Sequence, residues 1–324
     1  MTTGLMLERD LTVRVGPVEL PARAAGDVRI RPEWAGLCGS DLHVFSTGAW
    51  VDYWPAVLGH EVVGTVSASD DPAVPVGTRV VADSRYGCGD CADCARSARF
   101  CANLTWLGET RPGGYATELD VPAGTVYPVP AGLDLDVAVL AEPLAVVLRA
   151  LDGVTTRPDR VLVLGCGPIG ALIVTELQHR FPAAAVAVSE PQPARAEAAT
   201  RLGATVVAAP APDAYDLVID AAGFPGAVAA AFAAVRRGGT VLVVAIGDHP
   251  IPFTAQQLVE KGVTLMGGIG FDDEDLPRAL AALAERPQRY AGLVTHRVDL
   301  TAFPEFLATM PGLNTGKVIV RCQA

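Results

Sequence analysis

The chain has 324 residues, of which 50% are hydrophobic, and its formal net charge is −11. This length suits two domains, and the acidic balance argues against nucleic acid as a partner, because phosphate binding needs a basic face. Residues 1–16 show no signal peptide, and the longest apolar stretch, 221–235, is too short and too interrupted by glycine and proline to span a membrane. We therefore expect a soluble cytoplasmic protein whose clustered cysteines bind metal rather than form disulfides.

Residues 1 to about 145 are predicted to be rich in β-strands. Short apolar runs at 11–15, 28–31, 62–66 and 78–82 are separated by Gly, Pro, Asp and Ser, which is typical of strands bounded by turns. Two motifs, Cys-Gly-Ser-Asp-Leu-His at 38–43 and Gly-His-Glu at 59–61, lie among them. A thiolate, an imidazole and a carboxylate can hold zinc and leave a fourth position open, as catalytic zinc sites do.

Four further cysteines lie close together in the segment from about 86 to 103: Cys88, Cys91, Cys94 and Cys101. Four thiolates from one short segment close a tetrahedral shell, which predicts a structural zinc site. An iron–sulfur cluster is the competing interpretation, because bacterial ferredoxins begin with the same spacing. Their fourth spacing is shorter and ends in Cys-Pro, whereas Ala102 follows Cys101 here, so we expect zinc.

From residue 160 the pattern changes to apolar strands alternating with alanine-rich helices. The predicted strands are 161–164, 185–188, 217–220, 241–246 and 263–268, and the predicted helices are 169–179, 194–202, 227–235 and 256–260. This alternation indicates a parallel sheet with helices on both faces. A helix over 274–285 and a strand over 317–320 complete the chain.

A glycine-rich loop follows the first of these strands and opens a helix: Gly165, Gly167, Pro168, Ile169 and Gly170. Such a loop lets the backbone approach a dinucleotide pyrophosphate, which the helix N-terminus then stabilises. Glu190, about twenty positions on, is expected to accept hydrogen bonds from the adenosine ribose and to repel a 2′-phosphate, which favours NAD. Arg195 could meet that phosphate and keeps NADP open. The alternative is a plain glycine turn beside a solvated Glu190.

The zinc motifs, the cysteine segment, Ala-Glu-Pro-Leu at 141–144 and the glycine loop occur in this order in the zinc-dependent medium-chain dehydrogenases. Over essentially its whole length the chain resembles their polyol branch of sorbitol, threonine, butanediol and sugar-alcohol dehydrogenases. The resemblance implies an α/β fold with a GroES-like β-rich catalytic domain, residues 1–142 and 271–324. It also implies a doubly wound parallel-sheet Rossmann domain, residues 143–270, with the active cleft between the two.

The resemblance also implies ligands for a catalytic zinc ion. Cys38 and His60 are the first two, and either Glu61 or Glu142 is the third, one at a time. Asp41 is expected to orient His60 by accepting its other N–H.

A proton relay is the second role that the resemblance implies. Ser40 would accept the proton of the alcohol and His43 would pass it toward solvent, although a turn residue and a surface histidine are the plainer interpretations. Ala245 and Ile269 lie in segments that resemble those meeting the cofactor. Trp50, Tyr53 and Trp54 could wall the substrate pocket or could pack in the core.

The predicted function is NAD-dependent, reversible oxidation of a secondary alcohol of the polyol, sugar or cyclitol type, by a homodimer or homotetramer with one catalytic and one structural zinc. A quinone or enoyl reductase of the same superfamily is one alternative, but those relatives lack the zinc ligands. The other is a non-catalytic scaffold that keeps zinc and NAD as structural parts.

Overall fold

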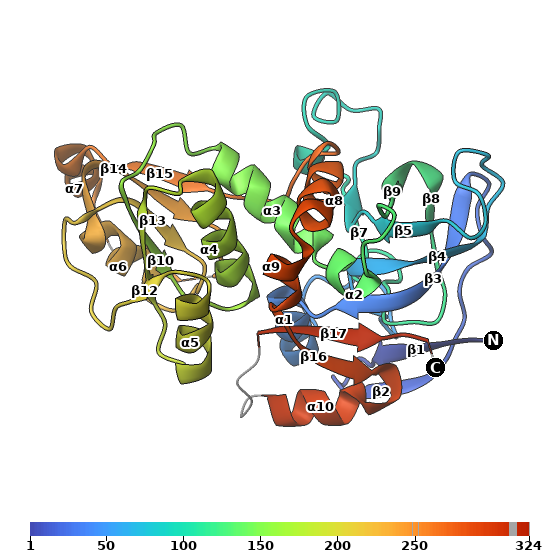
Figure 1. Cartoon of the computed structure of the whole chain (residues 1–324). Coiled ribbons are helices and arrows are strands. Elements are labelled where there is room, and N and C mark those ends of the chain that lie inside the picture. Colours follow the sequence, from blue (N-terminus) through green and yellow to red (C-terminus); the bar gives the residue numbers. More distant parts are fainter. Residues whose placement is uncertain (248, 252, 311–315, 324) are drawn as a thin grey trace. The chain divides into compact units, whose positions relative to one another are not determined.

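The computed structural model describes residues 1–247, 249–251, 253–310 and 316–323 (Figure 1). Two compact units make up the chain. The first comprises Met1–Pro143, Asp272–Leu313 and Lys317–Ala324, and the second comprises Leu144–Phe271 and Asn314–Gly316. Within the described ranges, no helix is long and apolar enough to cross a membrane.

The first unit is built on a largely antiparallel sheet in the order β16-β17-β3-β4-β5-β9, with β8 also paired to β3. Its strands are β1 (Thr2–Leu7), β2 (Val13–Val18), β3 (Asp27–Gly36), β4 (Glu61–Ala68), β5 (Arg79–Ala82), β6 (Arg85–Tyr86), β7 (Thr105–Trp106), β8 (Leu119–Pro122), β9 (Val126–Pro128), β16 (Val294–Asp299) and β17 (Lys317–Arg321). Its helices are α1 (Gly39–Thr47), α2 (Leu135–Ala138), α8 (Asp275–Glu285), α9 (Pro287–Ala291) and α10 (Phe303–Thr309), and α3 (Ala141–Asp152) begins in it. Short 3₁₀ turns lie at Ala98–Phe100, Ala123–Thr125 and Leu300–Ala302.

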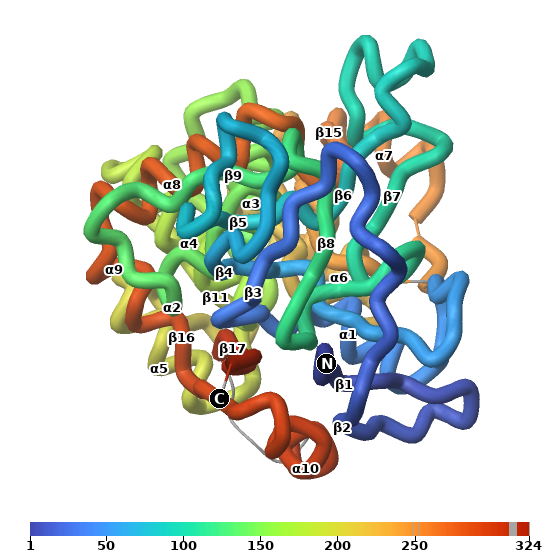
Figure 2. The backbone as a smooth tube through the Cα atoms, turned by 90° about the vertical axis from the view of Figure 1, so that its right-hand side faces the viewer, coloured from blue at the N-terminus to red at the C-terminus, as the bar shows by residue number. Residues whose placement is uncertain are grey.

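Strand β3 lies at the centre of this sheet, and its sequence explains why. Val28 and Ile30 are fully buried while the intervening Arg29 faces outward, which is the alternation of a strand with one face on the core. The last strand of the chain, β17, pairs with β3 in the register Ile319↔Gly36 and so joins the C-terminal segment to this sheet (Figures 1 and 2).

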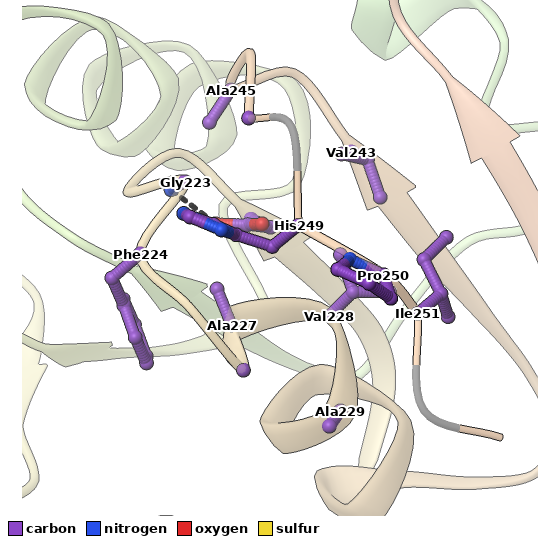
Figure 3. A pocket seen from close by; sticks show the side chains of 13 residues that line it. Gly223, Phe224, Ala227, Val228, Ala229, Val243, Ala245, His249, Pro250 and Ile251 are labelled. Atoms are coloured by element: carbon purple, nitrogen blue, oxygen red, sulfur yellow. Dashed lines mark hydrogen bonds between the residues drawn. The ribbon is translucent and has the colours of Figure 1, made fainter.

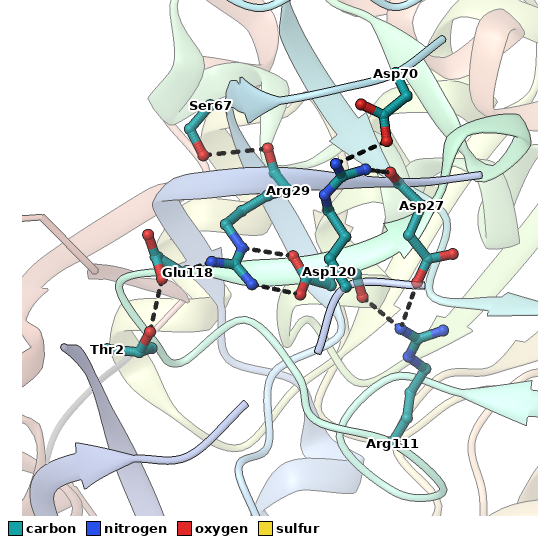
Figure 4. A network of polar contacts seen from close by, with 9 residues as sticks. Thr2, Asp27, Arg29, Ser67, Asp70, Arg111, Glu118 and Asp120 are labelled. Atoms are coloured by element: carbon teal, nitrogen blue, oxygen red, sulfur yellow. Dashed lines mark hydrogen bonds and ion pairs between the residues drawn. The ribbon is translucent and has the colours of Figure 1, made fainter. Parts of the chain in front are cut away.

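Polar contacts fasten β3 to β8 on the outer side (Figure 4). Arg29 donates two hydrogen bonds of 2.8 Å to the Asp120 carboxylate. Arg111 donates to the Asp120 carbonyl over 2.6 Å and lies 3.6 Å from the carboxylate of Asp27. Bidentate arginine–carboxylate pairs fix geometry more firmly than single contacts do, so Arg29 and Asp120 hold β3 against β8. Arg111 attaches its own turn to both strands through Asp120 and Asp27.

The second unit is a parallel sheet in the order β12-β11-β10-β13-β14-β15. Its strands are β10 (Arg160–Leu164), β11 (Ala185–Ser189), β12 (Thr205–Val206), β13 (Tyr215–Asp220), β14 (Val235–Val243) and β15 (Thr264–Gly267), and its helices are α4 (Pro168–Arg180), α5 (Pro193–Arg201), α6 (Ala227–Ala234) and α7 (Ala255–Lys261), besides most of α3. In strand order this is 3-2-1-4-5-6, the doubly wound arrangement of dinucleotide-binding domains. The predicted Rossmann fold is confirmed.

One strand of this sheet starts earlier than its sequence predicts. β14 begins at Val235, directly after α6, whereas the apolar pattern predicts a strand only from 241. The intervening Arg-Arg-Gly-Gly segment has no strand pattern, but Arg236 pairs with Asp216 on the neighbouring β13 at 2.5 Å. These residues form an irregularity in the pairing of β14 with β13, between the pairs Tyr215↔Val235 and Leu217↔Thr240, which explains why they lack a strand pattern.

Candidate functional site

The four clustered cysteines form one compact site. The Sγ atoms of Cys88 and Cys94 are 3.9 Å apart, those of Cys91 and Cys101 are 3.8 Å apart, and those of Cys88 and Cys101 are 3.6 Å apart. Tetrahedral zinc with Zn–S bonds of about 2.3 Å places its sulfur ligands about 3.8 Å apart. The donor set and its spacing therefore fit a single closed zinc site, as the sequence predicts.

Backbone amides support the sulfur atoms of this site. Gly89 N–H donates to Cys94 Sγ over 3.4 Å, Cys94 N–H to Cys91 Sγ over 3.3 Å, and Asn103 N–H to Cys101 Sγ over 3.3 Å. Hydrogen bonds to the charged form of an acid favour that form, so these amides stabilise thiolates. A Cβ on Gly87 would lie 2.5 Å from Cys94 Sγ, so only glycine fits there.

Removing one of the four cysteine ligands should lower the stability of the fold. We expect Cys94→Ser to release one zinc per chain and to lower the melting temperature, because a structural zinc site contributes folding free energy directly. Metal analysis and calorimetry measure the two effects, and Cys166→Ser, outside the segment, should keep the full zinc content. An unchanged melting temperature in Cys94→Ser would contradict a structural metal.

A second group of potential metal ligands lies where β3 ends and the neighbouring β4 begins. Cys38 follows β3 and is the N-cap residue of α1, and His60 directly precedes β4. Pairing of β3 with β4, in the register Gly36↔Glu61, brings the two motifs together. The ligand atoms of Cys38, His60 and Glu61 all lie within 4.8 Å of one another. A thiolate, an imidazole and a carboxylate in this arrangement fit zinc with an open fourth position.

Asp41 is buried beside this group and makes three contacts. Its Oδ2 accepts a 2.9 Å hydrogen bond from Cys38 N–H and lies 2.9 Å from the Tyr115 hydroxyl, which can donate to it. Its Oδ1 lies 3.6 Å from Nδ1 of His60. Burial opposes ionisation, but the charge of His60 and these hydrogen bonds hold the pKa of Asp41 below its ordinary value. Burial likewise opposes the charged form of His60, yet Asp41 and Cys38 raise its pKa well above the usual range.

The two candidate glutamates have different surroundings. The carboxylate of Glu61 is buried and forms an ion pair with Lys317, whose Nζ also donates to the Leu37 carbonyl over 3.0 Å. Burial raises the pKa of Glu61, although Lys317 counteracts the shift. Glu142, in the first turn of α3, accepts a 2.7 Å hydrogen bond from Ser84. Among the described residues, only Glu61 shares the ligand group of Cys38 and His60.

Ser40 and His43 lie one turn apart on α1, and positions three apart share a helix face. His43 is exposed, and its ring centroid lies 4.5 Å from that of Trp50. Within the described part of the chain, no hydrogen bond joins Ser40 to His43. Trp54 and Tyr53 pack against a hydrophobic core cluster of the first unit.

The glycine loop of the second unit has the geometry of a pyrophosphate site. Gly165 has φ +85°, and a Cβ on Gly170 would lie 2.2 Å from the Gly165 carbonyl oxygen, so both positions require glycine. Gly167 caps α4 without any side-chain hydrogen bond, and a Cβ there would meet only Arg195, 3.9 Å away. The first amides of α4 therefore have no side-chain cap, as the predicted pyrophosphate site requires.

Glu190 lies just beyond β11, next to the glycine loop. Its carboxylate accepts 2.8 Å hydrogen bonds from the backbone amides of Cys166 and Gln192. The residue thus fixes the loop as well as presenting negative charge where the sequence predicts a ribose partner. Burial raises the pKa of the Cys166 thiol to about 11, helped by the charge of Glu190, so this cysteine stays an unreactive thiol.

A pocket opens beyond the carboxyl ends of β13 and β14 (Figure 3). Asp220 stabilises its floor by accepting hydrogen bonds of 3.0 Å from the amides of Ala222 and Gly223. Ala245 lines the pocket, as do Phe224 and His249, which the sequence alone gave no reason to select. The only sequence feature that could have indicated them is their position shortly after the predicted strands 217–220 and 241–246. Ile269, beyond β15, is 56% exposed.

Comparison with known proteins agrees with this geometry. Residues 24–131 match the alcohol dehydrogenase GroES-like domain, and residues 168–285 match the zinc-binding dehydrogenase family. The chain is 28% identical to an L-threonine 3-dehydrogenase of Caldanaerobacter subterraneus, over 93% of each chain.

Two solved structures show the same fold and carry cofactors. An alcohol dehydrogenase from E. coli CFT073, complexed with NADH, is 25% identical over 99% of both chains with a TM-score of 0.89. A zinc-binding dehydrogenase from Sinorhizobium meliloti, bound to NADP, is 25% identical over 99% of both chains with a TM-score of 0.90.

The chain belongs to the zinc-dependent medium-chain dehydrogenases, in the polyol branch that includes the threonine dehydrogenases. It is an oxidoreductase of the alcohol dehydrogenase type, with a GroES-like domain and a Rossmann domain. Its cofactors are zinc and a nicotinamide dinucleotide.

Proposed function

We propose that this enzyme reversibly oxidises a secondary alcohol of the polyol, sugar or cyclitol type by hydride transfer to NAD. The convergence of Cys38, His60 and Glu61 into one group with an open position carries the proposal. A closed four-cysteine site elsewhere in the chain accounts for a second, structural metal. The relatives act on alcohols of several kinds, so the polyol class is inferred from Glu61 and Glu142 together with the family resemblance, rather than from any one of their names.

Zinc bound at the open site would supply a Lewis acid that acidifies a substrate hydroxyl, and NAD would accept the hydride. The chain's own residues hold and orient these groups. Cys38 and His60 supply a thiolate and an imidazole, and Asp41 faces the other ring nitrogen of His60, which fixes the ring. Ser40 would accept the hydroxyl proton, and the exposed His43 would release it to solvent.

Glu61 is the better candidate for the third ligand. It shares the ligand group of Cys38 and His60, while Glu142 is held by Ser84. Lys317 would compete with the metal for the Glu61 carboxylate, because the ion pair and the bond to zinc both need its oxygen atoms. Glu142 would take the third place when Glu61 remains with Lys317.

The function is tested by following NADH formation with a panel of polyols, sugars and cyclitols before and after removal of zinc. We expect turnover of at least one secondary alcohol, loss of that turnover on thorough chelation, and recovery on adding zinc. Full activity without zinc would refute the mechanism. Bound NAD with no turnover of any alcohol would favour the scaffold interpretation.

We infer a preference for NAD over NADP from the position of Glu190. Glu190→Ala should weaken NAD binding about tenfold, the order expected for hydrogen bonds to a charged group, and should weaken NADP binding less. Loss of the bonds to Cys166 and Gln192 affects both cofactors, so the ratio of the two dissociation constants is the informative quantity. Glu190→Gln, which retains an acceptor, is the matched control. Equal loss for both cofactors would refute a ribose role.

We also propose that the protein is a homodimer or homotetramer. Strand β15 is the last strand of its sheet among the described residues, and its sequence Thr-Leu-Met-Gly carries no charge or proline. Exposed apolar edge strands are sites of strand pairing between chains, and Leu265 is 38% exposed. A single-chain mass in sedimentation equilibrium would refute the proposal.

A further inference from the structure

The hydroxyl of Tyr115 lies beside the motif that supplies the first candidate zinc ligand. The side chain is fully buried, so its hydroxyl needs a hydrogen-bond partner within the protein. It lies 2.9 Å from the Gly36 carbonyl and 2.9 Å from Oδ2 of Asp41. These two acceptors flank Cys38 in the sequence, one at the end of β3 and one in the first turn of α1. One hydroxyl therefore contacts the chain on both sides of a candidate ligand.

The ring of Tyr115 contacts the motif that carries the second ligand. Gly59, which directly precedes His60, has φ +94°, and an added Cβ there would lie 2.9 Å from two carbons of the ring. The Tyr115 amide donates to the Leu58 carbonyl over 3.0 Å, which holds the backbone of the tyrosine beside this motif. The ring centroid of Phe303 lies 5.4 Å from that of Tyr115. The tyrosine is thus packed firmly against both ligand motifs.

The hydroxyl proton of Tyr115 determines how the Asp41 carboxylate is held. An ionised carboxylate accepts a stronger hydrogen bond than a backbone carbonyl does, so Asp41 is the stronger acceptor of the two. Its Oδ2 then accepts from two donors, because the amide of Cys38 donates to the same atom over 2.9 Å. Two donors on one oxygen oppose rotation of the carboxylate. The other oxygen, Oδ1, is left facing Nδ1 of His60 at 3.6 Å.

We propose that Tyr115 is a positioning residue for the open zinc site and acts on His60 through Asp41. With the carboxylate held in place, Nδ1 of His60 keeps its proton toward Oδ1, and Nε2 is left unprotonated for the metal. Removing a group that orients a metal-binding histidine weakens metal binding. The inference rests on the proposed zinc site and adds to it a residue that lies outside both ligand motifs.

The test removes the hydroxyl alone. Tyr115→Phe keeps the buried ring and loses both oxygen contacts. Competition with a chromophoric chelator, starting from the enzyme with two zinc ions per chain, measures the affinity of each site. We expect the open site of Tyr115→Phe to bind zinc about tenfold more weakly, the lower end of the range for groups that support a metal ligand. The four-cysteine site should be unaltered and serves as an internal reference.

Tyr53→Phe is the matched control, because it makes the same chemical change elsewhere in the same unit. The Tyr53 hydroxyl hydrogen-bonds the carbonyl and the amide of Val57, over 3.0 and 3.1 Å, instead of Asp41. We expect this variant to lose stability to a similar degree and to keep its zinc affinity. Equal weakening of the open site in both variants would indicate general loosening of the unit and would overturn the inference. Unaltered zinc affinity in Tyr115→Phe would overturn it as well.

A double-mutant cycle tests whether Tyr115 acts through Asp41. Asp41→Ala removes the carboxylate, so adding Tyr115→Phe to it should cost no further zinc affinity. Losses that add up in the double variant would contradict this route.

Because every readout is bound zinc, the result does not depend on turnover. Two zinc ions per chain with no turnover of any alcohol would refute the proposed function and leave the comparison of Tyr115→Phe with Tyr53→Phe decisive for this inference. A single zinc ion per chain in the unmodified enzyme would refute both.

Discussion

Replacing Cys38 by serine is expected to reduce alcohol turnover below detection while NAD still binds. A neutral hydroxyl is a far poorer zinc ligand than a thiolate, and Cys38 is one of three groups that converge on the open site. The glycine loop and Glu190 belong to the other unit. Loss of turnover should therefore occur without loss of the cofactor site.

Zinc content distinguishes this effect from general damage. Cys38→Ser should lose one zinc per chain and keep the one in the four-cysteine site, with little change in melting temperature. NAD affinity, measured by fluorescence titration, should match that of the unmodified enzyme. Turnover within a few-fold of the original in a variant that has lost this zinc would show that the open site is not the catalytic centre.

Replacing Lys317 by methionine is expected to produce the largest loss of stability. Its ammonium group and the Glu61 carboxylate are both almost fully buried and form an ion pair. Removing one partner of a buried pair leaves an uncompensated charge, at a cost of about 3–5 kcal/mol. Denaturant titration followed by tryptophan fluorescence should show this loss in the zinc-free protein, where no metal can substitute for the lysine.

Two further variants make this result specific. Lys317→Met combined with Glu61→Gln removes both charges and should recover much of the lost stability. Lys261, the other lysine of the chain, pairs with a largely exposed Asp213, and exposed pairs contribute little, so Lys261→Met should cost less. Equal losses for the two lysines would contradict the buried ion pair.

Sites built from neighbouring residues could be predicted from the sequence. The four cysteines lie within one short segment, so their spacing alone indicates a closed shell, and the Sγ distances agree with it. The glycine loop is equally local, because the strand, the turn and the helix N-terminus follow each other directly in the chain. Alternating strands and helices likewise predicted the Rossmann sheet, since burial on both faces requires continuous apolar strands.

Contacts between distant segments could not be predicted in this way. Nothing in the local pattern of Lys317 indicates that β17 pairs with β3 and so places its ammonium group against Glu61. The close approach of Gly108 to Gly59, the residue before His60, is likewise a contact between separate segments. The early start of β14 at Val235 also depends on neighbours that are remote in sequence. The same holds for the placement of Phe224 and His249 in the pocket.

The sequence by itself determined the family, the metal-binding residue types and the two-part organisation, because these depend on motifs whose members are near each other or occur in a fixed order. The tertiary structure decided which glutamate shares the group of Cys38 and His60, and which lysine forms an ion pair with that glutamate. The physical reason is that burial and charge pairing, which set these roles, arise from strand register and loop packing rather than from local sequence.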